Sequence, residues 1–102
     1  MTPSVTFTVQ LTLKPDEVER FCDSLLPELL QQTRGFEGVR SARAVRMDDG
    51  SNRVLFIDEF DSIEANQRYL AWREERGELT MLRSLLTQPP IMDLWPLTIK
   101  TV

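Results

Sequence analysis

Nine consecutive residues near the N-terminus, 5–13, alternate strictly between apolar and polar side chains. The odd positions hold Val, Phe or Leu, and the even positions hold Thr or Gln. Because successive side chains of a strand point to opposite faces, this period of two predicts a half-buried β-strand. The sheet that contains this strand must therefore have one packed face and one face that is wet or only moderately buried.

A first helix is expected to follow, beginning at Pro15 and ending at Gly35. Proline is favoured at the first helical position, and Asp16 and Glu17 then fall in the first turn, where the helix dipole stabilises negative charge. Pro27 lies inside the segment and lacks the N–H that a regular helix needs, so it predicts a kink. Apolar residues recur at helical spacing through the segment, at Val18, Phe21, Cys22, Leu25, Leu26, Leu29 and Leu30.

Two further strands are expected over 39–47 and 53–60. The turn between them, 48–52, reads Asp-Asp-Gly-Ser-Asn and is rich in residues that tolerate left-handed backbone, which is typical of a hairpin. A last strand is expected over 91–99. Pro96 lies inside it and indicates a sheet edge, a bulge or an interruption, because proline cannot donate to the sheet ladder.

The second long helix is expected to start directly after the third strand. Asp61 and, three residues later, Glu64 have the spacing of a capping box in its Asp form, with Asp61 as the N-cap. Gly77 is expected to end this helix. Leucines at 79, 82, 85 and 86 predict a short further helix that stops before the Pro89-Pro90 pair.

The second helix has polar side chains where an amphipathic helix normally has Leu or Ile. On a helical wheel, Asn66, Tyr69 and Arg73 occupy the centre of the side opposite the water-facing charges. Burying an unpaired amide or guanidinium costs several kcal/mol, so these side chains need partners. They line a cavity for water or a ligand, pair with a partner surface, or extend to water from the edge of a packed helix.

The order of elements is strand, helix, strand, strand, helix, short helix, strand. Each helix has one apolar stripe, so both are expected on the same face of a single sheet. This order predicts one α+β domain over residues 1–102, with the antiparallel sheet of the ferredoxin-like split βαβ arrangement. The other sheet face also carries apolar residues and has no third helix to cover it. A second copy of the sheet would cover it, which predicts a homodimer.

Composition excludes several classes of protein. The net charge of −4 argues against a nucleic-acid-binding protein. No segment approaches the ~20 apolar residues of a membrane span, and residues 1–5 lack the basic and apolar runs of a signal peptide. Cys22 is the only cysteine, so an internal disulfide is impossible and a reducing compartment is expected. These features fit a cytoplasmic protein.

Several short motifs, in this order of elements, resemble the antibiotic biosynthesis monooxygenase family. They are Phe-Glu-Gly-Val at 36–39, Ile-Asp-Glu-Phe-Asp-Ser at 57–62, Tyr-Leu-Ala-Trp-Arg at 69–73, the following Gly77, and the Pro89-Pro90 pair. Members of this family are dimeric α+β barrels with a pocket between the sheet and the helices of each subunit. The resemblance implies the same assembly and the same pocket here, over nearly the whole chain.

The family's activities include cofactor-free oxygenation of phenolic or anthrone-like aromatics, quinol oxidation and haem degradation. The chain departs from the family at three places. Branches with a histidine on the second helix would place it near Tyr69, and this chain has no His. Haem degradation in a related branch relies on a histidine axial ligand, so the lack of His also argues against that activity. Phe60 stands where many members have Trp. Phe56 stands where a polyketide-oxidising branch has Asn.

The remaining residues that resemble the family imply a site between the second helix and the sheet. The candidate catalytic residues are Tyr69, Arg73 and Asn66, in which Arg73 would stabilise an oxyanion, Tyr69 relay a proton and Asn66 fix a carbonyl. A flat apolar ring would need stacking surface around it. The candidate substrate-binding residues are Trp72, Phe56, Phe60, Trp95 and Asp58.

No general base is evident in this set, because Asp and Glu ordinarily titrate at about 4. The acidity of the substrate, increased by Arg73, would have to suffice. No metal site is expected either: Asp58, Glu59 and Asp61 do not converge, since neighbours on a strand point to opposite faces. The chain has no CxxC motif and no glycine-rich phosphate loop, so no cofactor is expected.

The sequence thus favours a cofactor-independent monooxygenase that oxidises a small hydroxylated aromatic or polyketide-like compound. One alternative is a cyclase or isomerase on the same scaffold. The other is a non-catalytic dimeric domain that binds a small ligand. A closed pocket too small for an aromatic ring would favour this last alternative.

Overall fold

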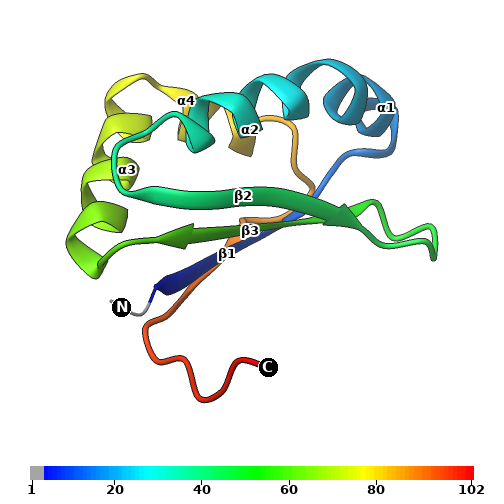
Figure 1. Ribbon diagram of the computed structural model, residues 1–102. Helices are drawn as coiled ribbons and strands as arrows, with labels where there is room; N and C mark the ends of the chain where they lie inside the picture. The colour runs from blue at the N-terminus through cyan, green and yellow to red at the C-terminus, as the bar shows by residue number, and fades with distance from the viewer. Residues whose placement is uncertain (1–3) are drawn as a thin grey trace.

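Four antiparallel strands form one sheet in the computed structural model, which describes residues 4–102 (Figure 1). The order across the sheet is β2-β3-β1-β4. The helices pack on one face, so the predicted α+β ferredoxin-like fold is confirmed. Residues 1–3 of the predicted domain lie outside the described residues. The strands are β1 (Val5–Thr12), β2 (Val39–Arg46), β3 (Arg53–Phe60) and β4 (Ile91–Trp95).

The first helical region is a series of turns of different width. Leu26 donates its N–H to the carbonyl of Phe21, which gives a wide π turn directly before Pro27. Pro27 has no N–H to offer to a regular helix, and the wide turn lies where that donor would be missing. The segments are η1 (Pro15–Glu17), α1 (Val18–Arg20), the π-helical η2 (Phe21–Leu25) and α2 (Leu26–Arg34), with Gly35 as the C-cap.

The second helical region contains α3 (Ile63–Glu75) and α4 (Glu78–Arg83), separated by Gly77 in the left-handed conformation (φ +77°). The expected N-cap Asp61 is wrong. Ser62 has the extended backbone of an N-cap, and its Oγ accepts the N–H of Ala65 at 3.1 Å. Within residues 4–102, no helix is long and apolar enough to cross a membrane.

Two predicted elements end earlier than expected. The short helix α4 stops at Arg83, and Leu86 instead forms an isolated β-bridge with Leu13. The last strand ends at Trp95, because Pro96 has no N–H with which to continue the ladder.

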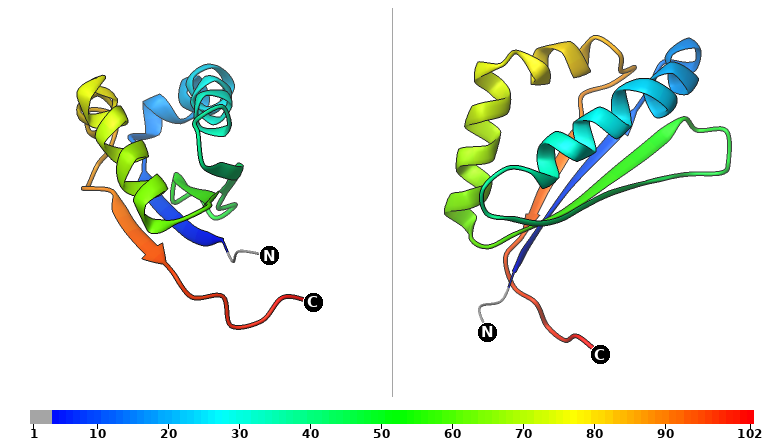
Figure 2. Two further views of the ribbon diagram at one scale, coloured as in Figure 1. Left: turned by 60° about the vertical axis from the view of Figure 1, so that its left-hand side comes forward. Right: turned by 45° about the horizontal axis from the view of Figure 1, so that its top comes forward.

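The core lies between the helices and the inner face of the sheet, in two clusters (Figure 2). The first consists of Leu11, Leu13, Val18, Phe21, Leu29, Val54, Phe56 and Leu86. The second consists of Val5, Phe7, Val39, Phe60, Ala65 and Tyr69. The odd residues of β1 contribute to both, as the alternation of the sequence predicts.

The outer face of the sheet is not covered by any helix in the described part of the chain (Figure 2). The polar residues of β1 point to this side, since its odd residues point inward. Trp95 pairs with Thr6, and its Nε1 donates to Thr8 Oγ at 3.0 Å, so its ring also lies on the outer face.

Candidate functional site

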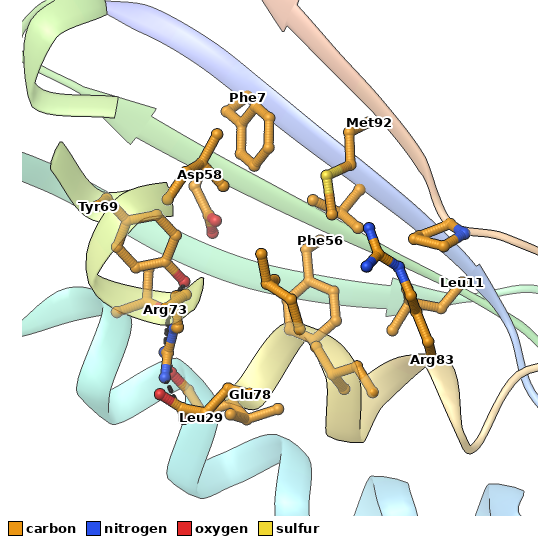
Figure 3. A pocket seen from close by; sticks show the side chains of 16 residues that line it. Phe7, Leu11, Leu29, Phe56, Asp58, Tyr69, Arg73, Glu78, Arg83 and Met92 are labelled. Atoms are coloured by element: carbon orange, nitrogen blue, oxygen red, sulfur yellow. Dashed lines mark hydrogen bonds and ion pairs between the residues drawn. The ribbon is translucent and has the colours of Figure 1, made fainter. Parts of the chain in front are cut away.

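An apolar pocket lies where the two core clusters meet, between the inner sheet face and helices α2, α3 and α4 (Figure 3). Most of its lining is aliphatic or aromatic. Its cavity volume is about 50 Å³, against the roughly 150 Å³ of an apolar cavity that binds benzene. An aromatic ring therefore requires some lining side chains to move. The polar residues of the lining are Thr33, Asp58, Tyr69, Arg73, Glu78 and Arg83.

Asp58 is a carboxylate at a core position of the sheet. The inward residues of β3 are Val54, Phe56, Asp58 and Phe60, so the strand's alternation puts the aspartate in line with three apolar side chains. It is only 3% exposed, and its Oδ1 has no hydrogen-bond partner in the part of the chain that the structure describes. Burial raises the pKa of Asp58 to about 7, and the positive charge of Arg73 opposes this rise only in part. Asp58 therefore exchanges its proton close to neutral pH.

Arg73 has a very different environment, because its guanidinium hydrogen-bonds with protein groups in every direction. Its Nε donates to the hydroxyl of Tyr69 at 2.9 Å. Its Nη1 donates to Gln32 Oε1 at 2.8 Å and to Glu78 Oε2 at 2.6 Å. Its Nη2 donates to the carbonyl of Leu29 at 3.1 Å and to Thr33 Oγ1 at 3.0 Å. A guanidinium has five N–H groups, and these bonds use them all.

The expected contact between Arg73 and a substrate oxyanion is therefore not available in this arrangement. Arg73 joins α3 to α2 and α4, and its carboxylate partner is Glu78 rather than Asp58. Burial raises the pKa of Glu78, but hydrogen bonds from Arg76 and Arg73 outweigh burial and hold this pKa below its usual value. Glu78 thus stays ionised and stabilises the buried cation.

Tyr69 belongs to the same hydrogen-bonded group. Its hydroxyl accepts from Arg73 Nε and shares a second hydrogen bond with Thr33 Oγ1 at 2.8 Å. Burial raises the pKa of Tyr69, although the hydrogen bonds from Thr33 and Arg73 oppose the rise, so the phenol stays neutral. Its ring is in contact with Phe36 and Phe60, with centroids 5.5 and 5.3 Å away.

The pocket brings together four of the predicted site residues: Phe56, Asp58, Tyr69 and Arg73. The other four do not line it. Asn66 is buried, and its Nδ2 is unpaired within residues 4–102, but it lies outside the lining. Phe60 is fully buried in the second core cluster. Trp72 packs beside that cluster, and the guanidinium groups of Arg73 and Arg76 each lie 4.8 Å from its ring centre. Trp95 lies on the opposite face of the sheet and is 56% exposed.

Sequence reasoning missed the contribution of α4 and the residues after it. Leu79, Leu82 and Arg83 line the pocket together with Pro90 and Met92. The leucine spacing predicted a helix there, but no local pattern showed which element its apolar side covers. Figure 3 shows Arg83 and Met92 at the end of the pocket away from Tyr69.

Residues 4–76 match the model of a family described as antibiotic biosynthesis monooxygenase. No curated protein matches the chain with significant sequence similarity.

Three similar solved structures share the fold across nearly the whole chain. Rv0793 from Mycobacterium tuberculosis is 18% identical with a TM-score of 0.82, covering 98% of this chain and 100% of its own. A variant of SnoaB, a cofactor-independent oxygenase from Streptomyces nogalater, is 24% identical with a TM-score of 0.77, covering 97% and 96%. A putative antibiotic biosynthesis monooxygenase from Deinococcus radiodurans is 15% identical with a TM-score of 0.83, covering 96% of each chain. Identities this low show a common fold only.

Proposed function

This chain belongs to the antibiotic biosynthesis monooxygenase family, and we propose that it is a cofactor-independent oxygenase that acts on a small hydroxylated aromatic or polyketide-like compound. The observation that carries the proposal is the pocket itself, an apolar space that contains one buried carboxylate oxygen without a partner among the described residues. Apolar walls suit a flat ring, and a single polar group fixes its orientation. The oxygenase activity of SnoaB on a similar fold supports the same conclusion.

The chemistry requires only the substrate and dioxygen. The O–H bond of the substrate breaks to leave an oxyanion, which makes the ring electron-rich enough to pass electrons to dioxygen. A C–O bond then forms at a ring carbon. The proton released from the substrate hydroxyl adds to the peroxide oxygen, and the resulting hydroperoxide loses water as its O–O bond and the C–H bond at that carbon break. One oxygen atom becomes a quinone carbonyl and the other leaves as water, so dioxygen accepts all the electrons that the substrate loses.

Oxygen uptake with a panel of quinols and anthrones tests this proposal. We expect uptake in proportion to protein concentration, with one quinone formed for each dioxygen consumed. Heat-inactivated protein corrects for spontaneous oxidation. Leu82→Trp, which fills the pocket, should abolish the uptake. Leu85→Trp is the matched control, because Leu85 lies on the same segment but faces a groove beside α1 instead. Equal rates with native and heat-inactivated protein across the panel would contradict the proposal.

A second candidate function is a non-catalytic small-ligand-binding domain. The small cavity favours this second function, because the volume of the pocket without a ligand is smaller than the volume of one aromatic ring. The two candidates differ in the panel experiment: a binding domain would retain a quinol or anthrone without consuming oxygen. A cyclase or isomerase would change the substrate without consuming oxygen.

We also propose that the protein is a homodimer that packs through the outer face of the sheet. Val45, Ile91 and Trp95 are exposed apolar residues on strands of this uncovered sheet. A stable interface of this kind buries at least ~1,200–2,000 Å² in total. Light scattering over a dilution series is the test, and a stable monomer of 11.8 kDa would contradict it.

A further inference from the structure

We propose that Asp58 is the general base of this pocket and that it restricts the substrate to planar apolar compounds with an acidic hydroxyl. This inference rests on the proposed function and deepens it, because it names the atom that takes the proton and the group that the substrate must carry. The sequence suggested only a wall position for this residue.

The position of the unpaired oxygen supports this role. Figure 3 shows the carboxylate of Asp58 among the rings of Phe7, Phe56 and Tyr69 at one side of the pocket. These rings offer it no hydrogen bond, and Oδ1 has no partner within the described residues. A buried acceptor without a donor is unfavourable, so a ligand hydroxyl that donates to it gains a strong charge-assisted hydrogen bond. A ligand without a hydroxyl would leave the acceptor unpaired.

The other polar groups that face the pocket are less suited to accept this proton. Arg73 and Tyr69 of α3 are bonded to each other and to α2. Glu78 of α4 is paired with Arg73 and Arg76. Arg83 of α4 remains cationic and has no acceptor. The inward neighbours of Asp58 on β1 and β2 are Phe7 and Ala42, which do not titrate.

The proton step is a simple transfer. The substrate O–H bond breaks, its electron pair stays on the substrate oxygen, and the proton moves to Asp58 Oδ1. Because burial raises the pKa of Asp58 to about 7, its proton affinity is closer to that of an acidic phenol than an ordinary carboxylate's is. The net charge of the pocket does not change during the transfer. Nearby Arg73 therefore interacts favourably with the site before and after it.

Equilibrium binding of 2-naphthol tests the inference without relying on turnover. Its fluorescence reports both binding and ionisation. We expect wild-type affinity to rise about tenfold between about pH 5.5 and pH 8, because an ionised carboxylate is a better acceptor than a protonated one. Asp58→Asn should show no such rise. The methyl ether 2-methoxynaphthalene cannot donate to the carboxylate, so its affinity for wild type should show no rise with pH, and this comparison needs no variant that must fold.

Glu59→Gln is the matched control. Glu59 is the next residue along β3, but it points to the outer face, where it accepts from Ser4 at 2.8 Å and from Ser41 at 3.1 Å. This variant should keep the wild-type pH dependence. Naphthol affinity that is independent of pH in wild type, an equal pH dependence for the methyl ether, or no saturable naphthol binding would overturn the role of Asp58.

The same measurement separates this inference from the proposed oxygenase activity. If naphthol binds as expected but no quinol or anthrone consumes oxygen, Asp58 is still the proton acceptor and the oxygenase proposal falls. If oxygen is consumed at the same rate by Asp58→Asn across the same pH range, the oxygenase proposal stands and the inference about Asp58 is wrong.

Discussion

Two buried charges face the same pocket, and the protein surrounds them in opposite ways. Arg73 and Asp58 are each 3% exposed. Arg73 makes hydrogen bonds with every N–H of its guanidinium. Asp58 has an oxygen with no hydrogen-bond partner among residues 4–102. A fully bonded buried ion fixes the elements around it, whereas an unpaired one lowers stability and is typical of a functional site. This difference favours a structural role for Arg73 and supports the chemical role proposed for Asp58.

The largest effect is expected from Arg73→Leu. The variant removes one of the two cations that pair with Glu78 and leaves acceptors on α2 and Tyr69 without their donor, so we expect a loss of roughly 3–5 kcal/mol of unfolding free energy. On the scale for small domains, the melting temperature should fall by more than about 10 °C. Arg76→Leu is the control, since Arg76 also pairs with Glu78 but is half exposed. The melting temperature of Arg76→Leu should change little. An unchanged melting temperature for Arg73→Leu would contradict the structural role of Arg73 and support its predicted contact with a ligand.

Asp58→Asn should have the opposite effect on stability, and the effect should depend on pH. The pKa of Asp58 is about 7 in the fold against an ordinary 3.8. Between these values the folded state binds more protons than the unfolded state, so wild-type stability falls as the pH rises from about 4 to 7. The variant lacks this fall. We therefore expect it to be more stable than wild type above pH 7, by up to about 4 kcal/mol.

Denaturant unfolding of both proteins at several pH values checks this prediction. The difference in unfolding free energy should grow from about pH 4 to pH 8 and then level off. Glu59→Gln, which removes a carboxylate from the outer face, provides the control for a general effect of charge. The difference in unfolding free energy between wild type and Asp58→Asn could instead be independent of pH. That result would mean that burial does not destabilise the ionised form of Asp58.

The fold could be predicted from the sequence because its signals are local. The alternation over 5–13 predicted which residues of β1 lie on its packed side, and Gly77 indicated where α3 ends. The prediction of the N-cap of α3 was wrong, and the reason is also local. Asp61 and Ser62 are both able to cap, and only the extended backbone at Ser62 decides between them.

The site was predicted only in part, because its properties depend on distant residues. Partners of Arg73 lie on α2, some forty residues earlier, and no periodic pattern in the sequence predicts these contacts. The inward register of Asp58 was visible in β3, but its raised pKa comes from burial, which exists only once the chain has folded. Trp95 was expected at the pocket, and the register of β4 turned it to the other face.

Tyr69→Phe should have the smallest effect on stability. It shows whether Tyr69 has a structural role like that of Arg73 or a chemical role like that proposed for Asp58. The sequence suggested a proton relay, but its hydroxyl is bonded to Arg73 and Thr33 like the rest of the structural group. Loss of the hydroxyl removes an acceptor for Arg73 Nε, so we expect about 1–2 kcal/mol of destabilisation and a melting temperature lower by several degrees. Naphthol affinity and its pH dependence should remain those of wild type, since Asp58 is intact. If the melting temperature is unchanged while turnover of an active quinol is lost, Tyr69 acts on the substrate. In that case Tyr69 has a chemical role, and Arg73 alone of the two has a structural one.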